Sequence, residues 1–142
     1  MALPQAIASG HWYTSAGDGR IAHGAHDDMA AAIAAGLAAA SNESKTYTLT
    51  GPQAYTVAEI ASLVSEVTGK PLDVVPVSDE ALTEGVNAAG VPEDFARIIV
   101  SFDANTRAGR IAMVAETVET LSGRKSKTLK QFLEANKAAL AG

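Results

Sequence analysis

The chain of 142 residues lacks several features that would place it in common classes of protein. It has no cysteine, which excludes disulfide bonds and thiolate metal sites and fits a cytoplasmic protein. Its most apolar stretch, residues 29–40, is about 12 residues long, whereas a membrane span needs about 20. The first residues show no basic segment followed by an apolar core, so no secretory signal is visible. We therefore expect a cytoplasmic location and no membrane partner.

Basic residues are also scarce, because 11 Lys and Arg stand against 16 Asp and Glu, a formal net charge of −5. A nucleic-acid partner would require a basic face to displace counterions from phosphates, so none is expected. The nearest basic cluster, residues 124–130, is interpreted as a solvated helix–loop junction. The hydrophobic fraction of 47% is that of a globular protein, and residues 1–142 are predicted to form one domain.

The motifs of several kinds of active site are missing as well. No G-x-G-x-x-G or P-loop joins a strand to a helix, so no cofactor-binding residue is assigned. None of the three tyrosines has a lysine four residues later, and no G-x-S-x-G elbow occurs, so no catalytic residue is assigned. The three histidines form no His-x-x-x-His pair on a helix, and no metal site is predicted.

What is present is a succession of short strands and amphipathic helices. Alternating or β-prone runs predict strands at 11–14, 45–50 and 72–77. Periodic apolar positions and end signals predict helices at 3–9, about 28–40, 57–68, 79–89, from 92 past 102, 114–121 and 129–140. The pattern is that of an α/β fold, a small sheet of two or three short strands covered by about five helices. So thin a sheet suggests a partner surface that completes it.

Local signals indicate where helices begin and which faces are buried. Asp27 or Asp28 is predicted to be the N-cap of the helix that follows, and Thr56 with Glu59 forms a capping box. Phe95, Ile98, Ile99 and Phe102 share one side of their helix, so Phe95 and Phe102 are predicted to lie in the core.

The run His11-Trp12-Tyr13 holds the only tryptophan of the chain. Aromatic planes with polar edges could line a slot for a flat ring such as a quinone; alternatively, these aromatics fill the core. Neighbouring residues of a strand point to opposite faces, so Trp12 is expected in the core and Tyr13 toward a pocket. Tyr13, His23 and Trp12 are the candidate substrate-binding residues.

Residues 3–35 resemble a stretch of the NmrA-like atypical short-chain dehydrogenases/reductases, in particular their NAD(P)H:quinone oxidoreductase branch. The letters that carry the resemblance are LPQAIASGHWYTSAGDGRIAHGAHDDMAAAIAA, with AGDGRIAH the most specific part. Further segments resemble the same family in the same order: KTYTLTGP (45–52), YTVAEIA (55–61), GVPE (90–93) and TLKQFL (128–133).

In that family an N-terminal Rossmann domain holds NADPH on a glycine-rich loop, and the C-terminal part shapes the quinone pocket. The resemblance concerns the C-terminal part alone. It implies a substrate-side, quinone-pocket domain over residues 1–142 that is not catalytic on its own, with no cofactor in this chain and NADPH in a full-length relative. A small quinone-like ligand and a homo-oligomer are the expected partners. The alternative is a non-catalytic module that senses redox state or self-associates.

Overall fold

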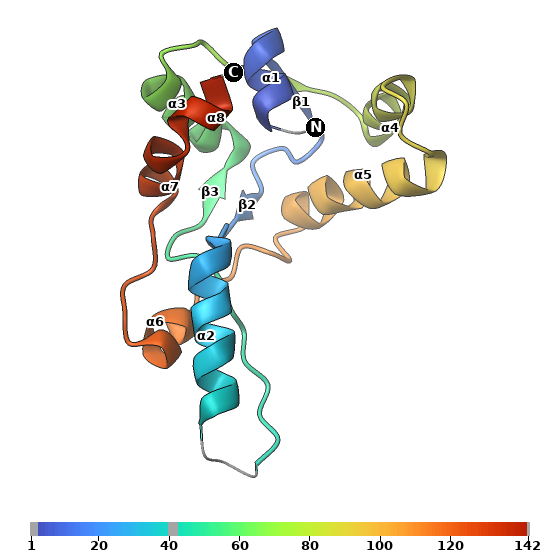
Figure 1. Ribbon diagram of the computed structural model, residues 1–142. Helices are drawn as coiled ribbons and strands as arrows, with labels where there is room; N and C mark the ends of the chain where they lie inside the picture. Colours follow the sequence, from blue (N-terminus) through green and yellow to red (C-terminus); the bar gives the residue numbers. More distant parts are fainter. Residues whose placement is uncertain (1–2, 40–42, 142) are drawn as a thin grey trace.

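The computed structural model describes residues 3–39 and 43–141, which form eight helices and four short strands (Figure 1). None of these helices combines the length and the apolar character that crossing a membrane requires. The helices are α1 (Leu3–Ser9), α2 (His26–Ala38), α3 (Val57–Thr68), α4 (Asp79–Ala88), α5 (Glu93–Arg107), α6 (Thr117–Ser122), α7 (Leu129–Ala135) and α8 (Lys137–Ala141). The strands are β1 (His11–Thr14), β2 (Arg20–Ile21), β3 (Tyr55–Thr56) and β4 (Asp73–Pro76).

The strands form two separate pairs. β1 and β4 run parallel, with Trp12 opposite Val74 and Thr14 opposite Pro76. β2 and β3 run antiparallel, with Ile21 opposite Tyr55. The predicted α/β class with little sheet is confirmed, although the strands are divided between two sheets.

Helix ends follow from local chemistry. Thr56 accepts a hydrogen bond from the Glu59 backbone while the Glu59 carboxylate accepts one from Thr56 N–H, which confirms the capping box of α3. Gly69 ends that helix in the left-handed conformation, φ 74°, which suits a residue without Cβ. Ser78 caps α4 in the same way that Thr56 caps α3, and Thr128 and Gln131 form a second capping box at α7.

The predicted N-cap of α2 was wrong. Ala25 occupies that position, and both Asp27 and Asp28 lie within the first turn of the helix. Their carboxylates bind the loop before α7 instead: Asp28 Oδ2 accepts from Lys127 N–H at 2.7 Å, and Asp27 pairs with Lys127 Nζ at 2.5 Å. The tertiary contact therefore determines where these two side chains point.

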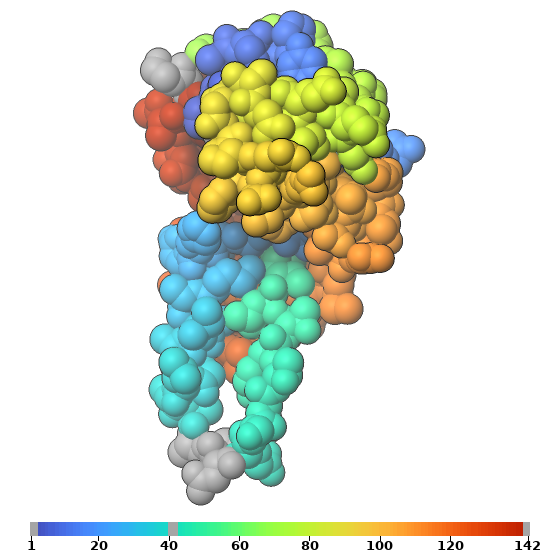
Figure 2. All heavy atoms as spheres, turned by 90° about the vertical axis from the view of Figure 1, so that its right-hand side faces the viewer, coloured from blue at the N-terminus to red at the C-terminus, as the bar shows by residue number. Residues whose placement is uncertain are grey.

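The predicted strand at 45–50 was also wrong, since this segment joins no ladder within the described part of the chain. It runs back along α2, and Figures 1 and 2 show both projecting from the rest of the molecule. A strand exists only when a second strand supplies hydrogen bonds, and none lies beside this segment among the described residues.

The core lies where α1, α3 and α7 meet. Val64 of α3 and Leu133 of α7 are fully buried in it, and Ala6 and Ile7 contribute from α1. Trp12 of β1 is partly buried and packs against the same cluster. The β1–β4 pair is therefore backed by the core on one side only.

Phe95 and Phe102 do not lie in the core as predicted. Their exposed fractions are 63% and 60%, and that of Ile98 is 54%. The buried positions of α5 include Ala96 and Val100, which point away from this face, and Thr106 in its last turn. Periodicity identified the residues that share a face, but here small residues make the tight contact and the aromatic face remains open.

Candidate functional site

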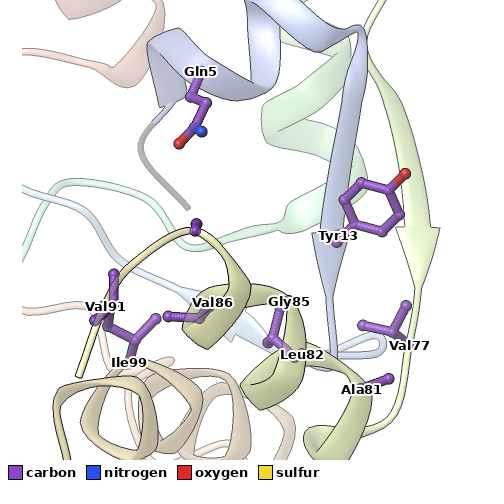
Figure 3. Close-up of a pocket in the computed structure, with 10 residues that line it drawn as sticks. Gln5, Tyr13, Val77, Ala81, Leu82, Gly85, Val86, Val91 and Ile99 are labelled. Carbon is purple, nitrogen blue, oxygen red and sulfur yellow. The ribbon is translucent and has the colours of Figure 1, made fainter. Parts of the chain in front are cut away.

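A pocket of about 820 Å³ lies between β1, α1, α4 and α5 (Figure 3). Its volume is in the range of small-molecule sites. Nearly all of its lining is apolar. The lining residues are Gln5, Tyr13, Val77, Ala81, Leu82, Gly85, Val86, Ala89, Val91 and Ile99.

Local structure brings these residues together from distant parts of the sequence. Tyr13 lies on the face of β1 opposite to Trp12, as the alternation of a strand requires. α4 begins directly after β4, because Ser78 accepts a hydrogen bond from Ala81 N–H at 3.2 Å. That start places Leu82 and Gly85 along one wall of the pocket, as Figure 3 shows.

Polar contacts at the end of β1 hold α5 in place. Asp103 Oδ2 accepts hydrogen bonds from Thr14 Oγ1 at 2.7 Å and from Ser15 N–H at 2.8 Å. Arg107 donates to the Ser15 carbonyl and pairs with Asp79 at 2.9 Å. The Arg107 guanidinium lowers the pKa of the Asp79 carboxyl below its ordinary value. α4 and α5, the two helical walls, are thus tied to the same strand end.

The pocket combines an apolar wall with two polar side chains. Tyr13 supplies the only aromatic ring among the lining residues, and Gln5 supplies the only side-chain amide. Tyr13 is 41% exposed, and its ring lies 6.3 Å from that of His11 at a tilt of 54°. A flat apolar molecule could pack against this wall, with a phenol and an amide available for its polar edges.

The structure separates the three residues predicted to bind substrate. Tyr13 lines the pocket, Trp12 faces the core, and His23 lies between β2 and α2, outside the lining. His23 is exposed, yet enough protein surrounds its ring that desolvation lowers its pKa below 6.5. Sequence reasoning missed the contribution of α4 and α5, because Leu82, Gly85 and Ile99 carry no chemical signature. The one available signal was Gly85, a glycine inside a helical pattern.

The four longer helices do not fit the pyrophosphate of a nicotinamide nucleotide. Such a group binds at a helix start with free backbone N–H groups and no negative charge. The four longer helices begin with their own acidic side chains: Asp27 and Asp28 in α2, Glu59 in α3, Asp79 and Glu80 in α4, and Glu93 and Asp94 in α5. Within the described residues, no three His, Asp or Glu side chains gather in a way that could hold a metal ion.

Among curated proteins, the chain is similar to reductases. It is 30% identical to an NAD(P)H azoreductase of Xenophilus azovorans over 92% of this chain and 46% of that protein. It is 29% identical to quinone oxidoreductase 2 of Escherichia coli over 89% of this chain and 44% of that protein. The chain thus spans less than half the length of these relatives. No protein-family model matches it.

Solved structures agree with the sequence relatives. The NADPH-dependent quinone oxidoreductase QOR2 of Escherichia coli superposes with a TM-score of 0.88 at 27% identity, covering 94% of this chain and 48% of that one. The triphenylmethane reductase of Citrobacter sp., solved with NADP(H), gives 0.85 at 32% identity over 94% of this chain and 46% of that one. These similarities place the chain with the NmrA-like reductases, as a C-terminal part of such a protein.

Proposed function

We propose that this chain is the substrate-side domain of an NAD(P)H-dependent reductase, and that the pocket beside Tyr13 binds a flat, conjugated electron acceptor such as a quinone. The observation that carries the proposal is the apolar pocket of about 820 Å³ with one phenol and one amide on its wall. Residues 1–142 act as one domain in this proposal.

The names of the relatives support the same class of ligand. They reduce azo compounds, quinones or triphenylmethane dyes, which are all planar or propeller-shaped conjugated molecules. Their names also imply a nicotinamide nucleotide as the reductant. Because the four longer helices of this chain begin with acidic side chains, the nucleotide would be held by a separate domain, and this chain would bind the acceptor.

Gly85→Leu tests the pocket without disturbing the fold. A Cβ at Gly85 would meet nothing within 4 Å, and leucine favours a helix by up to about 1 kcal/mol relative to glycine. The new side chain would occupy the pocket. We expect saturable quenching of Trp12, the only tryptophan, by 1,4-naphthoquinone, and at least tenfold weaker binding of that quinone to Gly85→Leu.

Ala88→Leu is the matched control, because Ala88 is an exposed residue of α4 that does not line the pocket. It should bind the quinone as the original chain does. An original chain that shows no saturable quenching, or a Gly85→Leu variant of unchanged affinity, would refute the pocket as the binding site.

A second role, self-association without catalysis, is favoured by the open face of α5. Phe95, Ile98 and Phe102 lie at spacings of three and four residues and are all more than half exposed. A second copy of the chain could cover this aromatic face with its own, as in a two-fold symmetric contact. The role of α5 in association is separable from quinone binding, because Phe95, Ile98 and Phe102 do not line the pocket. Their neighbour Ile99 does.

A further inference from the structure

The two sides of the pocket are supported in different ways. Gln5 and Tyr13 belong to α1 and β1, and these elements also pack in the core through Ala6 and Trp12. The facing wall is formed by α4 and α5, two helices joined by a short turn (Figure 3). Because one wall is part of the core, the width of the pocket depends on how the other wall is held.

Helix α4 is held mainly at its beginning. It packs chiefly against α5, and Leu82 is its only buried residue. At its other end Ala88, Ala89 and Gly90 are all exposed, and Gly90 turns the chain toward α5 with φ 89°. Ala89 at this open end lines the pocket. A helix attached in this way can pivot about its first turn.

Arg107, the last residue of α5, is bound to that first turn. Its guanidinium donates hydrogen bonds to both oxygens of the Asp79 carboxylate, at 3.1 and 2.9 Å, and another to the Ser15 carbonyl. Asp79 is the first residue of α4, and Ser15 directly follows β1. A planar guanidinium that bonds both carboxylate oxygens fixes direction as well as distance. One side chain thus joins the end of α5, the start of α4 and the strand that carries Tyr13.

The end of α5 is bound to β1 by further contacts that do not involve Arg107. Asp103, one turn earlier, accepts hydrogen bonds from Thr14 Oγ1 and from Ser15 N–H. The turn at Gly19 touches the backbone of α5, where an added Cβ would lie 2.1 Å from the Thr106 carbonyl oxygen. Loss of the Arg107 side chain would therefore leave α5 on β1 and release the start of α4.

A small movement at the start of α4 becomes larger at its open end. The ten residues of α4 are about 15 Å long at about 1.5 Å per residue. A rotation of about 10° at Asp79 would thus move the end near Ala89 by about 2–3 Å. Movements of this size decide whether an acceptor with one more fused ring fits between the two walls.

We propose that Arg107 is a positioning residue that sets the width of the pocket and thereby the size of the electron acceptor that the pocket admits. It acts through α4, because neither Arg107 nor Asp79 lines the pocket. The proposal rests on the quinone site proposed above. With the pair formed, α4 is held in one position and larger acceptors are disfavoured; without it, the preference moves toward larger acceptors.

The test compares Arg107→Ala with Arg97→Ala. Arg97 is the matched control, because it is also on α5, pairs with Glu93 at 2.5 Å and lies outside the pocket lining. Binding of 1,4-naphthoquinone and of the larger 1,4-anthraquinone is measured by the quenching of Trp12. We expect the ratio of the two dissociation constants to shift at least fivefold toward the larger quinone in Arg107→Ala and to stay unchanged in Arg97→Ala.

This ratio separates positioning from a general loss of stability. A variant that is partly unfolded binds both quinones more weakly by the same factor, so the ratio does not change. Asp79→Asn should shift the ratio in the same direction as Arg107→Ala. The double variant should shift it no further than Arg107→Ala alone, because both substitutions remove the same contact. An unchanged ratio in Arg107→Ala, with quinone binding intact, would overturn the proposal.

Hydrogen exchange of amides 83–88 in α4 provides a readout without a ligand. We expect at least tenfold faster exchange in Arg107→Ala than in Arg97→Ala, with the amides of α3 unchanged in both. Equal exchange of the α4 amides overturns the proposal whether or not a quinone binds. If the original chain shows no saturable quenching, the quinone site and the size selection both fail, whereas faster exchange would still show that Arg107 holds α4. If Arg107→Ala does not fold, Asp79→Asn replaces it in both measurements.

Discussion

At the scale of single residues, His23 is a titratable group whose environment differs between the folded and unfolded chain. Desolvation by surrounding protein lowers its pKa below the ordinary 6.5. The folded state therefore favours the neutral ring. By linkage, the unfolded chain binds more protons than the folded chain between the folded pKa and 6.5, so stability is complete above that range and falls as the pH drops through it.

We expect the urea midpoint of the original chain to decrease between pH 7 and pH 5 more than that of His23→Gln. His11 and His26 are present in both proteins, so any contribution they make to the change in midpoint is the same in both and cancels in the comparison. Glu59 and Asp79 do not interfere, because their carboxyl pKa values lie below the ordinary 4.5 and 3.8, and their contributions are lost only at lower pH. If the urea midpoints of the two proteins decrease equally over this pH range, the ring of His23 is not desolvated in solution.

Tyr13 illustrates what a sequence reveals about a single site residue. The alternation of a strand predicts that Trp12 and Tyr13 point to opposite sides, and the structure places Trp12 against the core and Tyr13 at the pocket. Whether Tyr13 binds a substrate remains a prediction. The apolar residues opposite it, such as Leu82 and Ile99, lie 69 and 86 residues further along the chain. Nothing in these two residue types distinguishes a pocket wall from a core.

At the scale of elements, two backbone segments meet at Gly19. A Cβ there would lie 2.1 Å from the Thr106 carbonyl oxygen and 2.7 Å from Arg107 N, so the turn before β2 touches the end of α5. We expect Gly19→Ala to lower the free energy of unfolding by about 1–3 kcal/mol, the usual cost of overpacking. Thermal or urea unfolding measures the change.

Gly85→Ala is the contrasting substitution, since its Cβ would meet nothing within 4 Å and the residue is inside a helix. It should stabilise the chain by about 0.5–1 kcal/mol. An unchanged stability of Gly19→Ala would mean that the turn and α5 are not in contact in solution.

The elements that could be predicted are those specified by their own residues. Thr56 with Glu59, and Ser78 at its helix start, act within one turn, so α3 and α4 were predicted nearly to the residue. The segment 45–50 depends on a partner strand that no local pattern can supply. Asp27 and Asp28 have the chemistry of caps, but Lys127, about 100 residues away, binds them instead.

At the scale of the whole molecule, exposed apolar residues lie on α2, at Ile33 and Leu37, and on α5, at Phe95, Ile98 and Phe102. We predict that the chain alone self-associates through Phe95 and Phe102, because burying these rings against a second copy removes apolar area from water. Light scattering over a range of concentrations should show a mass above that of the monomer, and Phe95→Ser with Phe102→Ser should reduce it.

Met113→Ser with Val114→Ser is the control, since these residues are exposed and apolar but lie off α5. It should leave the measured mass unchanged. A strictly monomeric chain at every concentration would contradict self-association.

The contacts that close this molecule join residues very far apart in the sequence. Thr14 bonds Asp103 at a separation of 89 residues, and Lys127 bonds Asp28 at a separation of 99. The parallel pairing of β1 with β4 likewise encloses the whole of α2 and α3. Closing such large loops costs conformational entropy before the contacts that stabilise the fold can form. The search for the native topology should therefore be slow, on the order of milliseconds to seconds, with the docking of Lys127 on α2 among its last events.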